Sequence, residues 1–364
     1  MRAMQIQRRY DSVGYMLAVG VSTVPRTTMR WGRTPICGQP VLTVVERGGF
    51  YLPYGDLWMD ARRAKDFAVV SHAHSDHTAR HRSFLATPAT IDCMRVRMGA
   101  AVASRGIALH YGEVYQHGPL RIQLFPAGHV LGSAMVRVEA PNGASLLYTG
   151  DFKMRASLSA EQIEIPQADT LVMESTFGRP ECVFPSTAEL QAQLSDFCHT
   201  ALRANEVPVL LAYSLGKAQE VLKHLQPHNF PLMAHQTIRA LNVVYQQHGC
   251  PMPDTRPLDF LNMAGTVVVM PPAVRKQLPQ GPHRLAMISG WGLDARSRFR
   301  YQTDTVLPLS DHADYPDLLN FVDQVKPNLV YTVHGATAQL AAALRRYGIE
   351  AWSLNGADQL ELDV

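Results

Sequence analysis

The segment VVSHAHSDHTARH, residues 69–81, places four histidines and one aspartate directly after a pair of valines. His72 and His74 are two positions apart and share one face of a strand, whereas Asp76 and His77 must lie on the turn beyond it. Neutral imidazole and carboxylate are good zinc ligands. We therefore predict two adjacent metal ions, one held by the first two residues and one by the last two. A surface loop rich in histidine by chance is the alternative, but the H-x-H-x-D-H spacing after a buried strand favours metal binding.

Two metals need further ligands, and candidates stand at the ends of later strands. His129 follows LFPAG and precedes VLGSAMV. Asp151 ends the segment SLLYTGD, and a carboxylate can bridge two ions. Taken alone, either residue could equally be structural. Their order along the chain, after the cluster, favours metal binding for both.

The hydrophobic pattern predicts an opening block made mostly of strands, residues 41–178. FAVVSHAH is a strand that ends in the histidine cluster, and LRIQLFPAGHV, AMVRVEAPNGASLLYTGD and DTLVMEST continue the pattern, with Pro-Asn-Gly as a hairpin turn. From Pro185 onward, strands alternate with helices. Ser186 and Glu189 form a capping box, which should open a helix that ends at about Arg203.

The middle block, residues 179–305, is therefore expected to be an α/β unit. VPVLLAYS, PLMAH, GTVVVMPP and LAMISGW are typical of strands, and KAQEVLKHL and QTIRALNVVYQQHG are typical of helices. Residues 306–364 follow with a helix, a strand and a helix in FVDQVKPNLVYTVHG and TAQLAAALRRYG. The pattern predicts an α/β protein built from these three consecutive segments.

Composition argues against several classes of protein. The 364 residues hold five cysteines, none paired as C-x-x-C, so we expect neither a disulfide framework nor a cysteine zinc cluster, and a reducing cytoplasm fits best. No apolar run reaches the roughly 18 residues that a membrane helix needs. Residues 1–40 carry six arginines and one acid, a net of +5 against +3 for the whole chain, so the remainder carries −2. The body of the protein lacks the bulk positive charge of a general nucleic-acid coat.

The arginine-rich segment 1–40 has no clear periodicity. We expect it to be a disordered or wrongly included extension that folding and activity do not need, because ordering it would cost entropy without an evident core to join. A structured arm and a targeting peptide are the alternatives. Asp11 and the lack of an A-x-A cleavage site argue against the targeting peptide.

The motifs H-x-H-x-D-H, GHVLGS and YTGD resemble the metal motifs of the metallo-β-lactamase fold. Asp60, twelve residues before His72, matches the early aspartate that supports the ligand loop of this fold. In small hydrolases of the fold, the last histidine ligand follows the bridging aspartate fairly closely. Here the best candidate is His334 in LVYTVHG, far beyond Asp151 along the chain, with the whole α/β block in between.

That interruption resembles the β-CASP nucleases, whose additional motifs match Glu174 in MESTFG, His312 in LSDHAD and His334 in VHG. The resemblance extends over residues 41–364. The wording ESTFG, YSLGKAQE, ISGWG, PLSDHADYPDL and VHG is most similar to the bacterial ligase-associated DNA exonucleases.

The resemblance implies a metallo-β-lactamase αββα sandwich, formed by residues 41–178 and 306–364, with an inserted α/β β-CASP domain at 179–305. It also implies two zinc ions, with manganese as an alternative or a supplement. The first ion would be held by His72, His74 and His129, the second by Asp76, His77 and His334, and Asp151 would bridge them. The catalytic set would be His312 as general acid, Glu174 as the acceptor that orients it and raises its pKa, and Asp76.

Substrate contacts are predicted at two places. In YSLGKAQE, Gly216 and Lys217 suggest a nucleotide loop, but the earlier glycine is missing and Ala218 follows the lysine, so ATP binding is not expected. A strand-to-helix junction favours a phosphate, so Ser214 and Lys217 are predicted to hold the nucleic-acid backbone; ordinary helix capping is the alternative. In RSRFRYQ, alternation would put Arg298 and its two neighbouring arginines on one face, either as a strand that lines the cleft or as a solvated edge.

These residues predict a two-metal phosphodiesterase, because two metals can activate a water and neutralise a phosphate while His312 protonates the leaving oxygen. We expect a sequence-independent DNA exonuclease acting in DNA repair on single-stranded ends, with 5′→3′ polarity and a functional association with a DNA ligase and a helicase. An RNA exo- or endonuclease is the alternative, since His334 is typical of RNA-processing members, whereas relatives of Artemis carry valine there. The long insert with Glu174 and His312 argues against a small-molecule hydrolase such as a thioesterase or lactamase. The complete ligand set argues against a non-catalytic scaffold.

Overall fold

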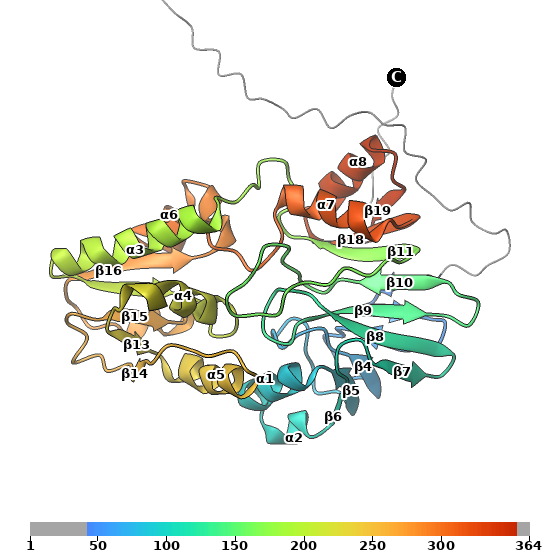
Figure 1. The fold of residues 1–364 in the computed structure, drawn as a ribbon, viewed down its shortest axis with the longest axis horizontal. Helices are drawn as coiled ribbons and strands as arrows, with labels where there is room; N and C mark the ends of the chain where they lie inside the picture. The colour runs from blue at the N-terminus through green and yellow to red at the C-terminus, as the bar shows by residue number, and fades with distance from the viewer. Residues whose placement is uncertain (1–41, 355–364) are drawn as a thin grey trace, which may run out of the picture. The chain divides into compact units, whose positions relative to one another are not determined.

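The computed structural model describes residues 42–354 (Figure 1). The expectations for residues 1–40 lie outside this described range. Across this described range, no helix is both long and apolar enough to cross a lipid bilayer.

The first sheet has six strands in chain order. The first three strands pair antiparallel, and the third to the sixth pair parallel. The strands are β1 (Val45–Glu46), β2 (Phe50–Leu52), β3 (Leu57–Met59), β4 (Phe67–Val69), β5 (Ser83–Ala86) and β6 (Gly106–Ala108). The histidine cluster follows β4 directly, as the sequence predicts.

The second sheet has seven strands in the order β19-β18-β11-β10-β9-β8-β7. They are β7 (Val114–His117), β8 (Leu120–Pro126), β9 (Ala134–Glu139), β10 (Ser145–Tyr148), β11 (Thr170–Ser175), β18 (Leu329–Gly335) and β19 (Ala351–Ser353). Strand β18 pairs parallel with β11, in a register that sets Thr170 opposite Leu329. The chain therefore leaves this sheet after β11 and returns to the position beside it only at β18, after a long excursion.

The two sheets pack face to face around one apolar core, to which both contribute buried side chains such as Leu52, Met59, Ile122 and Val136. Helices α7 (Tyr315–Val325) and α8 (Thr337–Arg346) pack on the outer face of the second sheet. Helices α1 (Pro88–Met98) and α2 (Ala100–Ala103) pack on the outer face of the first. The resulting α–β–β–α layering confirms the expected sandwich.

The third sheet lies within the excursion and is parallel throughout, in the order β14-β13-β15-β12-β16-β17. Its strands are β12 (Val207–Leu211), β13 (Leu232–Ala234), β14 (Arg256–Pro257), β15 (Val267–Met270), β16 (His283–Ile288) and β17 (Thr305–Leu307). The accompanying helices are α3 (Thr187–Arg203), α4 (Lys217–Leu225), α5 (Gln236–Gln247) and α6 (Ser297–Tyr301), with short 3-10 turns η1 (Gln226–His228), η2 (Pro272–Gln277) and η3 (Gly290–Leu293). An inserted α/β unit is thus confirmed, while its boundaries at 178/179 and 305/306 stay a prediction.

Helix α3 begins as its sequence predicts. The Ser186 hydroxyl accepts from the Glu189 amide at 3.3 Å, and the Glu189 carboxylate accepts from the Ser186 amide at 2.8 Å. Helix α1 was not predicted; its signal was the Thr87-Pro88 pair, because Thr87 caps the helix and Pro88 occupies its first turn. The strand considered for RSRFRYQ is wrong, since residues 297–301 form helix α6.

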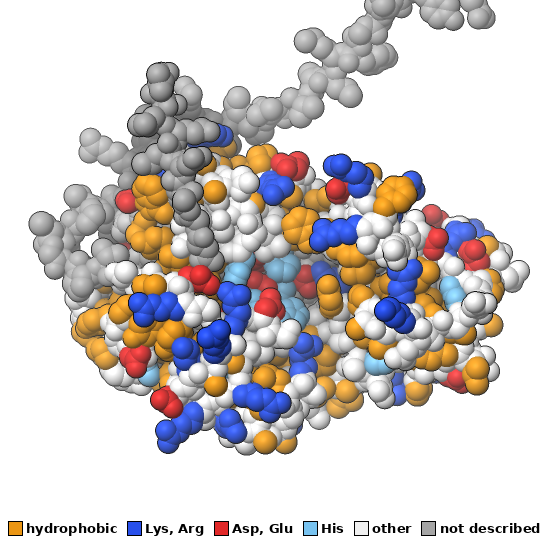
Figure 2. Space-filling view, turned by 180° about the vertical axis from the view of Figure 1, so that it is seen from behind, with side chains coloured by type: hydrophobic (Ala, Val, Ile, Leu, Met, Phe, Trp, Pro, Cys, Tyr) orange, Lys and Arg blue, Asp and Glu red, His pale blue; other side chains and the backbone are white. Residues whose placement is uncertain are grey.

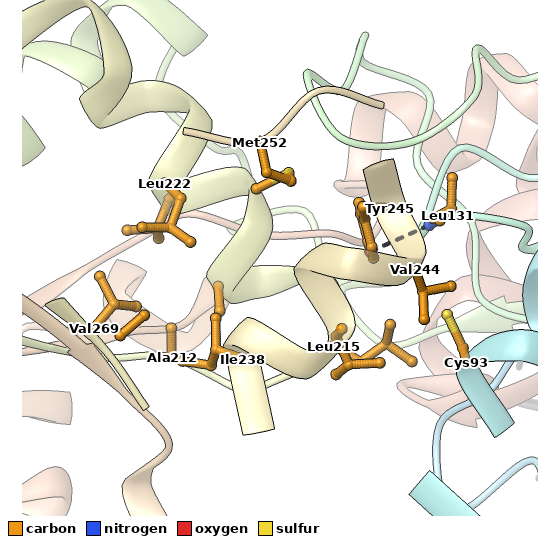
Figure 3. Close-up of a cluster of buried hydrophobic side chains, with 14 of the residues drawn as sticks. Cys93, Leu131, Ala212, Leu215, Leu222, Ile238, Val244, Tyr245, Met252 and Val269 are labelled. Carbon is orange, nitrogen blue, oxygen red and sulfur yellow. Dashed lines mark hydrogen bonds between the residues drawn. The ribbon is translucent and has the colours of Figure 1, made fainter. Parts of the chain in front are cut away.

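The inserted unit rests on the first sheet's helical layer through α5 (Figure 3). Val244 lies beside Cys93 of α1, and the Tyr245 hydroxyl accepts a hydrogen bond from the Leu131 amide at 3.4 Å. The His248 ring, just after α5, lies 2.9 Å from a carboxylate oxygen of Asp92. These contacts anchor the insert close to the loop that carries His129.

Candidate active site

Most of the predicted site residues line one open pocket of about 800 Å³, to which both the sandwich and the inserted unit contribute. Figure 2 shows histidine and carboxylate side chains gathered in this hollow, with lysine and arginine side chains around it. The lining includes His74, Asp76, His77, Asp151, Ser214, Lys217, His312 and His334. His72, His129 and Glu174 are buried beneath this lining.

The first predicted metal group converges on one point. His74 Nδ1 lies 3.0 Å from His72 Nε2 and 3.1 Å from His129 Nε2. Three nitrogens around a tetrahedral zinc, each about 2.0–2.1 Å from the ion, would stand about 3.3 Å apart. The Oδ2 atom of Asp151 lies 3.6 Å and 3.8 Å from the Nε2 atoms of His72 and His129. These four residues can therefore surround a single ion.

The outer hydrogen bonds of two of these rings decide which nitrogen faces inward without a proton. His129 Nδ1 lies 2.7 Å from the Asp311 carbonyl, and His74 Nε2 lies 3.2 Å from the Leu215 carbonyl. A carbonyl oxygen only accepts, so both outer nitrogens carry the hydrogen. In the neutral rings, the inner nitrogens therefore present lone pairs to each other.

His72 follows the same pattern through a hydroxyl. The Ser71 hydroxyl donates to Asp60 Oδ2 at 2.5 Å, so it must accept from His72 Nδ1, 3.0 Å away. The inner Nε2 of His72 is then a third lone pair. Burial, the largest influence on each, lowers the pKa of His72 and His74, and it lowers the pKa of His129 to about 3. Because protons are disfavoured there, a metal cation fits the three converging lone pairs.

The second predicted group is looser. His77 Nε2 lies 3.4 Å from Asp151 Oδ2 and 3.7 Å from Asp76 Oδ2, and the Asp76 side chain is 74% exposed. The His334 ring lies 5.8 Å from the His77 ring between centroids, and its Nε2 is buried without a hydrogen-bond partner within residues 42–354. A buried ring nitrogen without a hydrogen-bond partner fits the role of a metal ligand.

A β-bulge turns His334 toward this group. Glu174 pairs with Val333 and Ser175 with Gly335, so His334 is the extra residue between two registers. Its φ of +55° is in the left-handed region, which histidine enters more readily than most residues. Bulges re-aim side chains in this way next to functional sites.

One buried carboxylate supports both groups. Asp60 accepts hydrogen bonds from the Ser71 amide at 2.7 Å and hydroxyl at 2.5 Å, and from the Tyr148 hydroxyl at 2.8 Å. It also lies 2.7 Å from His77 Nδ1. Asp60 thus orients His77 directly and His72 through Ser71, which is the supporting position that its sequence match implies.

His312 and Glu174 form the expected pair. His312 Nδ1 lies 2.9 Å from both carboxylate oxygens of Glu174, which also accept from the Phe152 amide at 2.9 Å and the Thr176 hydroxyl at 2.5 Å. Burial lowers the pKa of His312, but the carboxylates of Glu174 and Asp151 together raise it to about 9. The second ring nitrogen, Nε2, lies 4.0 Å from Asp151 Oδ2, so its proton is held beside the metal groups.

The residues predicted to contact the substrate differ in whether their side chains are free to face the pocket. Ser214 lines the pocket, with its hydroxyl 2.9 Å from the Thr237 hydroxyl. The Lys217 ammonium is buried and forms an ion pair with Asp311, so it is already engaged. Arg298 is exposed and stacks over the Phe299 ring at 4.6 Å; its neighbours Arg300 and Tyr301 line the pocket instead.

Sequence reasoning missed three kinds of contributor. Asp311 receives Lys217 and orients His129 through its carbonyl; its place beside His312 was the available signal. Ser71 stands directly before the first ligand, yet nothing in its type marks it. Tyr213 and Trp291 line the pocket from the motifs YSLGK and ISGWG, which carry the family resemblance.

Comparisons with known proteins bear on this site. Residues 297–353 match the family described as the Zn-dependent metallo-hydrolase RNA specificity domain (RMMBL). Over 322 residues, the chain is 43% identical to a "Probable DNA ligase" of Opitutus terrae. It is 24% identical over 401 residues to transcription termination factor FttA of Pyrococcus abyssi, and 29% identical over 182 residues to an RNase J-like protein of Methanocaldococcus jannaschii.

These matches support the resemblance to the β-CASP proteins of the metallo-β-lactamase fold. The alignments cover 87%, 82% and 44% of this chain, but only 31%, 62% and 43% of the three relatives, so the chain is about a third of the length of the Opitutus protein. A solved structure from Enterococcus faecalis V583, of a protein of unknown function, shares the fold with a TM-score of 0.55 and 16% identity, over 75% of this chain and 76% of the other. The histidine and carboxylate groups of this chain suit the zinc of the matched family description.

Proposed function

We propose that the chain is a two-metal phosphodiesterase that shortens DNA from single-stranded ends. The observation that carries the proposal is the placement of the His312–Glu174 pair beside the converging ligand group in one pocket. A proton donor next to a dense ligand group is what hydrolysis of a phosphodiester requires. The long insert together with this pair argues against a small-molecule hydrolase such as a lactamase or thioesterase.

The residues of the chain divide the work. Bound ions would neutralise the phosphate charge and activate a water; they would be held by His72, His74 and His129 at one position, by Asp76, His77 and His334 at the other, and by Asp151 between them. His312 holds a proton on Nε2 and donates it to the leaving oxygen. Glu174 keeps the other ring nitrogen protonated and fixes the orientation of the ring.

Different observations favour DNA and RNA as the substrate. The relative with 43% identity over 87% of this chain carries the name of a DNA ligase, which favours DNA and an association with ligation. The RNA specificity description, the RNase J-like relative and His334 favour RNA. We propose DNA as the substrate, with an RNA exo- or endonuclease as the second candidate.

Matched single-stranded DNA and RNA of one sequence, each labelled at either end, test this proposal. We expect sequence-independent release of short products from DNA, beginning at the 5′ end. Faster digestion of RNA would move the assignment to the second candidate. Mononucleotide released first from a 3′ label would reverse the polarity, and cuts confined to one internal sequence would contradict an exonuclease. The His312→Ala variant is the control for a contaminating nuclease.

The proposed partners follow from the same relative. We propose that the chain prepares ends for a DNA ligase, together with a helicase that exposes single strands. The test is a ligation assay on a nicked duplex with a short 5′ single-stranded flap. The chain should make this substrate sealable, whereas a chain without effect on sealing would contradict the role in repair.

A further inference from the structure

Two aromatic side chains stand exposed at the edge of the metal pocket. Tyr213 is 57% exposed and Trp291 is 45% exposed, and both line the pocket. Large aromatic rings gain much from burial, so a ring left in water beside a reactive site indicates a ligand that covers it. The other exposed aromatic side chains of residues 42–354 are Tyr54, Phe299 and Tyr347, and none of these lines the pocket.

Trp291 is held in place from beneath. Its amide donates to the Ser289 hydroxyl at 3.3 Å, and its ring lies 4.9 Å from the buried Phe177 ring at 47°. Gly290 permits this packing, because a Cβ there would stand 2.5 Å from Phe177 Cζ. The exposed face of the indole is therefore oriented before any ligand arrives, which lowers the entropic cost of binding.

The same Phe177 ring connects Trp291 to the proposed general acid. The Phe177 and His312 ring centroids are 6.1 Å apart, and the Phe177 and Trp291 ring centroids are 4.9 Å apart. The indole and imidazole centroids are therefore no farther apart than the sum of these two distances, which is a length that one nucleotide can span. A base that adjoins the reacting phosphate can consequently reach the indole.

Charge in the pocket suits the same ligand. Arg97 and Arg300 also line it, and cations interleaved with exposed aromatic rings are the usual combination for binding single-stranded nucleic acid. The hydroxyls of Ser214 and Ser310 add hydrogen-bonding groups for a sugar–phosphate chain.

We propose that Trp291 and Tyr213 form a stacking subsite for the bases of a single-stranded end, with Trp291 taking the base next to the phosphate that is cut. This inference rests on the proposed nuclease function and makes it more specific. A paired base has its faces covered by its neighbours in the duplex, so the subsite selects single strands. Stacking is indifferent to the sugar, so the subsite does not separate DNA from RNA.

The test pairs a change in the ring with a change in the base. Wild type and Trp291→Ala are compared on a single-stranded oligonucleotide and on the same oligonucleotide with an abasic residue next to the cut. For wild type, removing the base should lower kcat/KM by roughly 5- to 150-fold, the effect of one base–aromatic stack. Trp291→Ala should show this loss already with the intact strand and little further loss with the abasic one. Trp291→Phe should restore most of the difference.

Tyr347→Ala is the matched control, since it removes another exposed aromatic ring that is not part of the pocket. It should keep the wild-type ratio between the two oligonucleotides, and metal content should be unchanged in every variant. A Trp291→Ala enzyme that still distinguishes the oligonucleotides as wild type does would overturn the assignment to Trp291. A wild type that cuts both strands equally well would overturn the subsite and leave the nuclease function standing.

Titrating both oligonucleotides by fluorescence anisotropy separates the two proposals. A wild type that binds the intact strand more tightly than the abasic one but cuts neither would support the subsite and contradict the proposed function. Equal binding of both strands by wild type and Trp291→Ala would instead indicate that another occupant, such as an aromatic side chain of a partner protein, covers the rings, and would overturn the inference.

Discussion

At the scale of single residues, His312 is held by a carboxylate and not by the ligand groups. Its Nδ1 is fully engaged by Glu174, 2.9 Å away, and its Nε2 is no nearer than 4.0 Å to the proposed bridging carboxylate of Asp151. We therefore expect His312→Ala to retain its metal and to lose activity by roughly 10²–10⁴-fold, as for a lost general acid. Metal analysis and single-turnover cleavage on one preparation test this; loss of metal together with activity would make His312 a ligand instead.

Lys217 leads to a different expectation. Its ammonium pairs with Asp311, whose carbonyl orients His129, so the lysine acts on the ligand group through two contacts. Lys217→Met should leave a buried carboxylate unpaired, at a cost of about 3–5 kcal/mol in stability, and should weaken metal binding by roughly 10–100-fold. Competition with a zinc chelator measures the affinity, with Lys223→Met in the same helix as the control. Weaker DNA binding with unchanged metal affinity would instead support the prediction that Lys217 contacts a phosphate of the substrate.

These two residues show what the sequence could reveal at this scale. The types and spacing of the residues around His72 predict the ligand group, whereas His312 was assigned as the acid only through the family resemblance. The role of Lys217 depends on Asp311, a partner far away in the sequence, and that of Arg298 depends on the short helix α6. A period of two cannot be told from a helix turn over so few residues.

At the scale of elements, helix α4 is tied to the loop that follows Asp151. Glu220, in its first turn, accepts from the hydroxyls of Ser157 at 2.6 Å and Ser159 at 2.7 Å, and pairs with Lys153 at 3.1 Å. Burial raises the pKa of Glu220, but His224, Lys153 and the two hydroxyls outweigh it and hold the pKa well below its ordinary value. The charged carboxylate therefore stabilises the contact between the inserted unit and the sandwich.

This network predicts a dependence of stability on pH. Because the folded-state pKa of Glu220 is lowered, its contribution is present above the unfolded pKa of about 4.3 and is lost as pH falls below it. Glu220→Gln should lower the unfolding free energy at pH 7 by about 3–5 kcal/mol, and the difference from wild type should shrink progressively as pH falls below about 4.3 toward the lowered folded-state pKa. Urea unfolding at several pH values measures it. A difference that stays constant with pH would show that the charge of Glu220 is not what stabilises the contact.

The elements themselves could be predicted to unequal degrees. Strand β8 follows from alternation, β4 and β11 follow from short apolar runs, and the start of α3 follows from Ser186 and Glu189, since all of these signals are local. Helix α1 was missed because its buried residues fall in two adjacent groups, 89–91 and 93–94, and do not form a stripe at the helical period. The order of strands in the three sheets also had no local signal, as it depends on pairing between distant segments.

At the scale of the whole molecule, the inserted unit helps to position the proposed metal ligands. The Leu215 carbonyl, at the junction of β12 and α4, fixes the tautomer of His74, and Lys217 holds the residue that fixes His129. The anchors at α5 and Glu220 keep that junction in place. The long gap in the sequence between Asp151 and His334 therefore does not separate two sites, because the insert contributes to the site it interrupts.

The same arrangement predicts how metal is bound and lost. The group of His72, His74, His129 and Asp151 converges without His334, whereas the second group includes the exposed Asp76 and the orphaned His334 Nε2. We expect two zinc-type ions per wild-type chain and one per His334→Ala chain, with exposed His110→Ala as the control that keeps both.

Three inward lone pairs beside carboxylates repel one another without a cation, so chelator should lower the melting temperature of wild type, and added zinc should restore it in proportion to the logarithm of its concentration. Elemental analysis and thermal unfolding measure these outcomes. A His334→Ala chain that keeps two ions or loses both, or a wild type that is fully active and equally stable in strong chelator, would contradict the two-site arrangement.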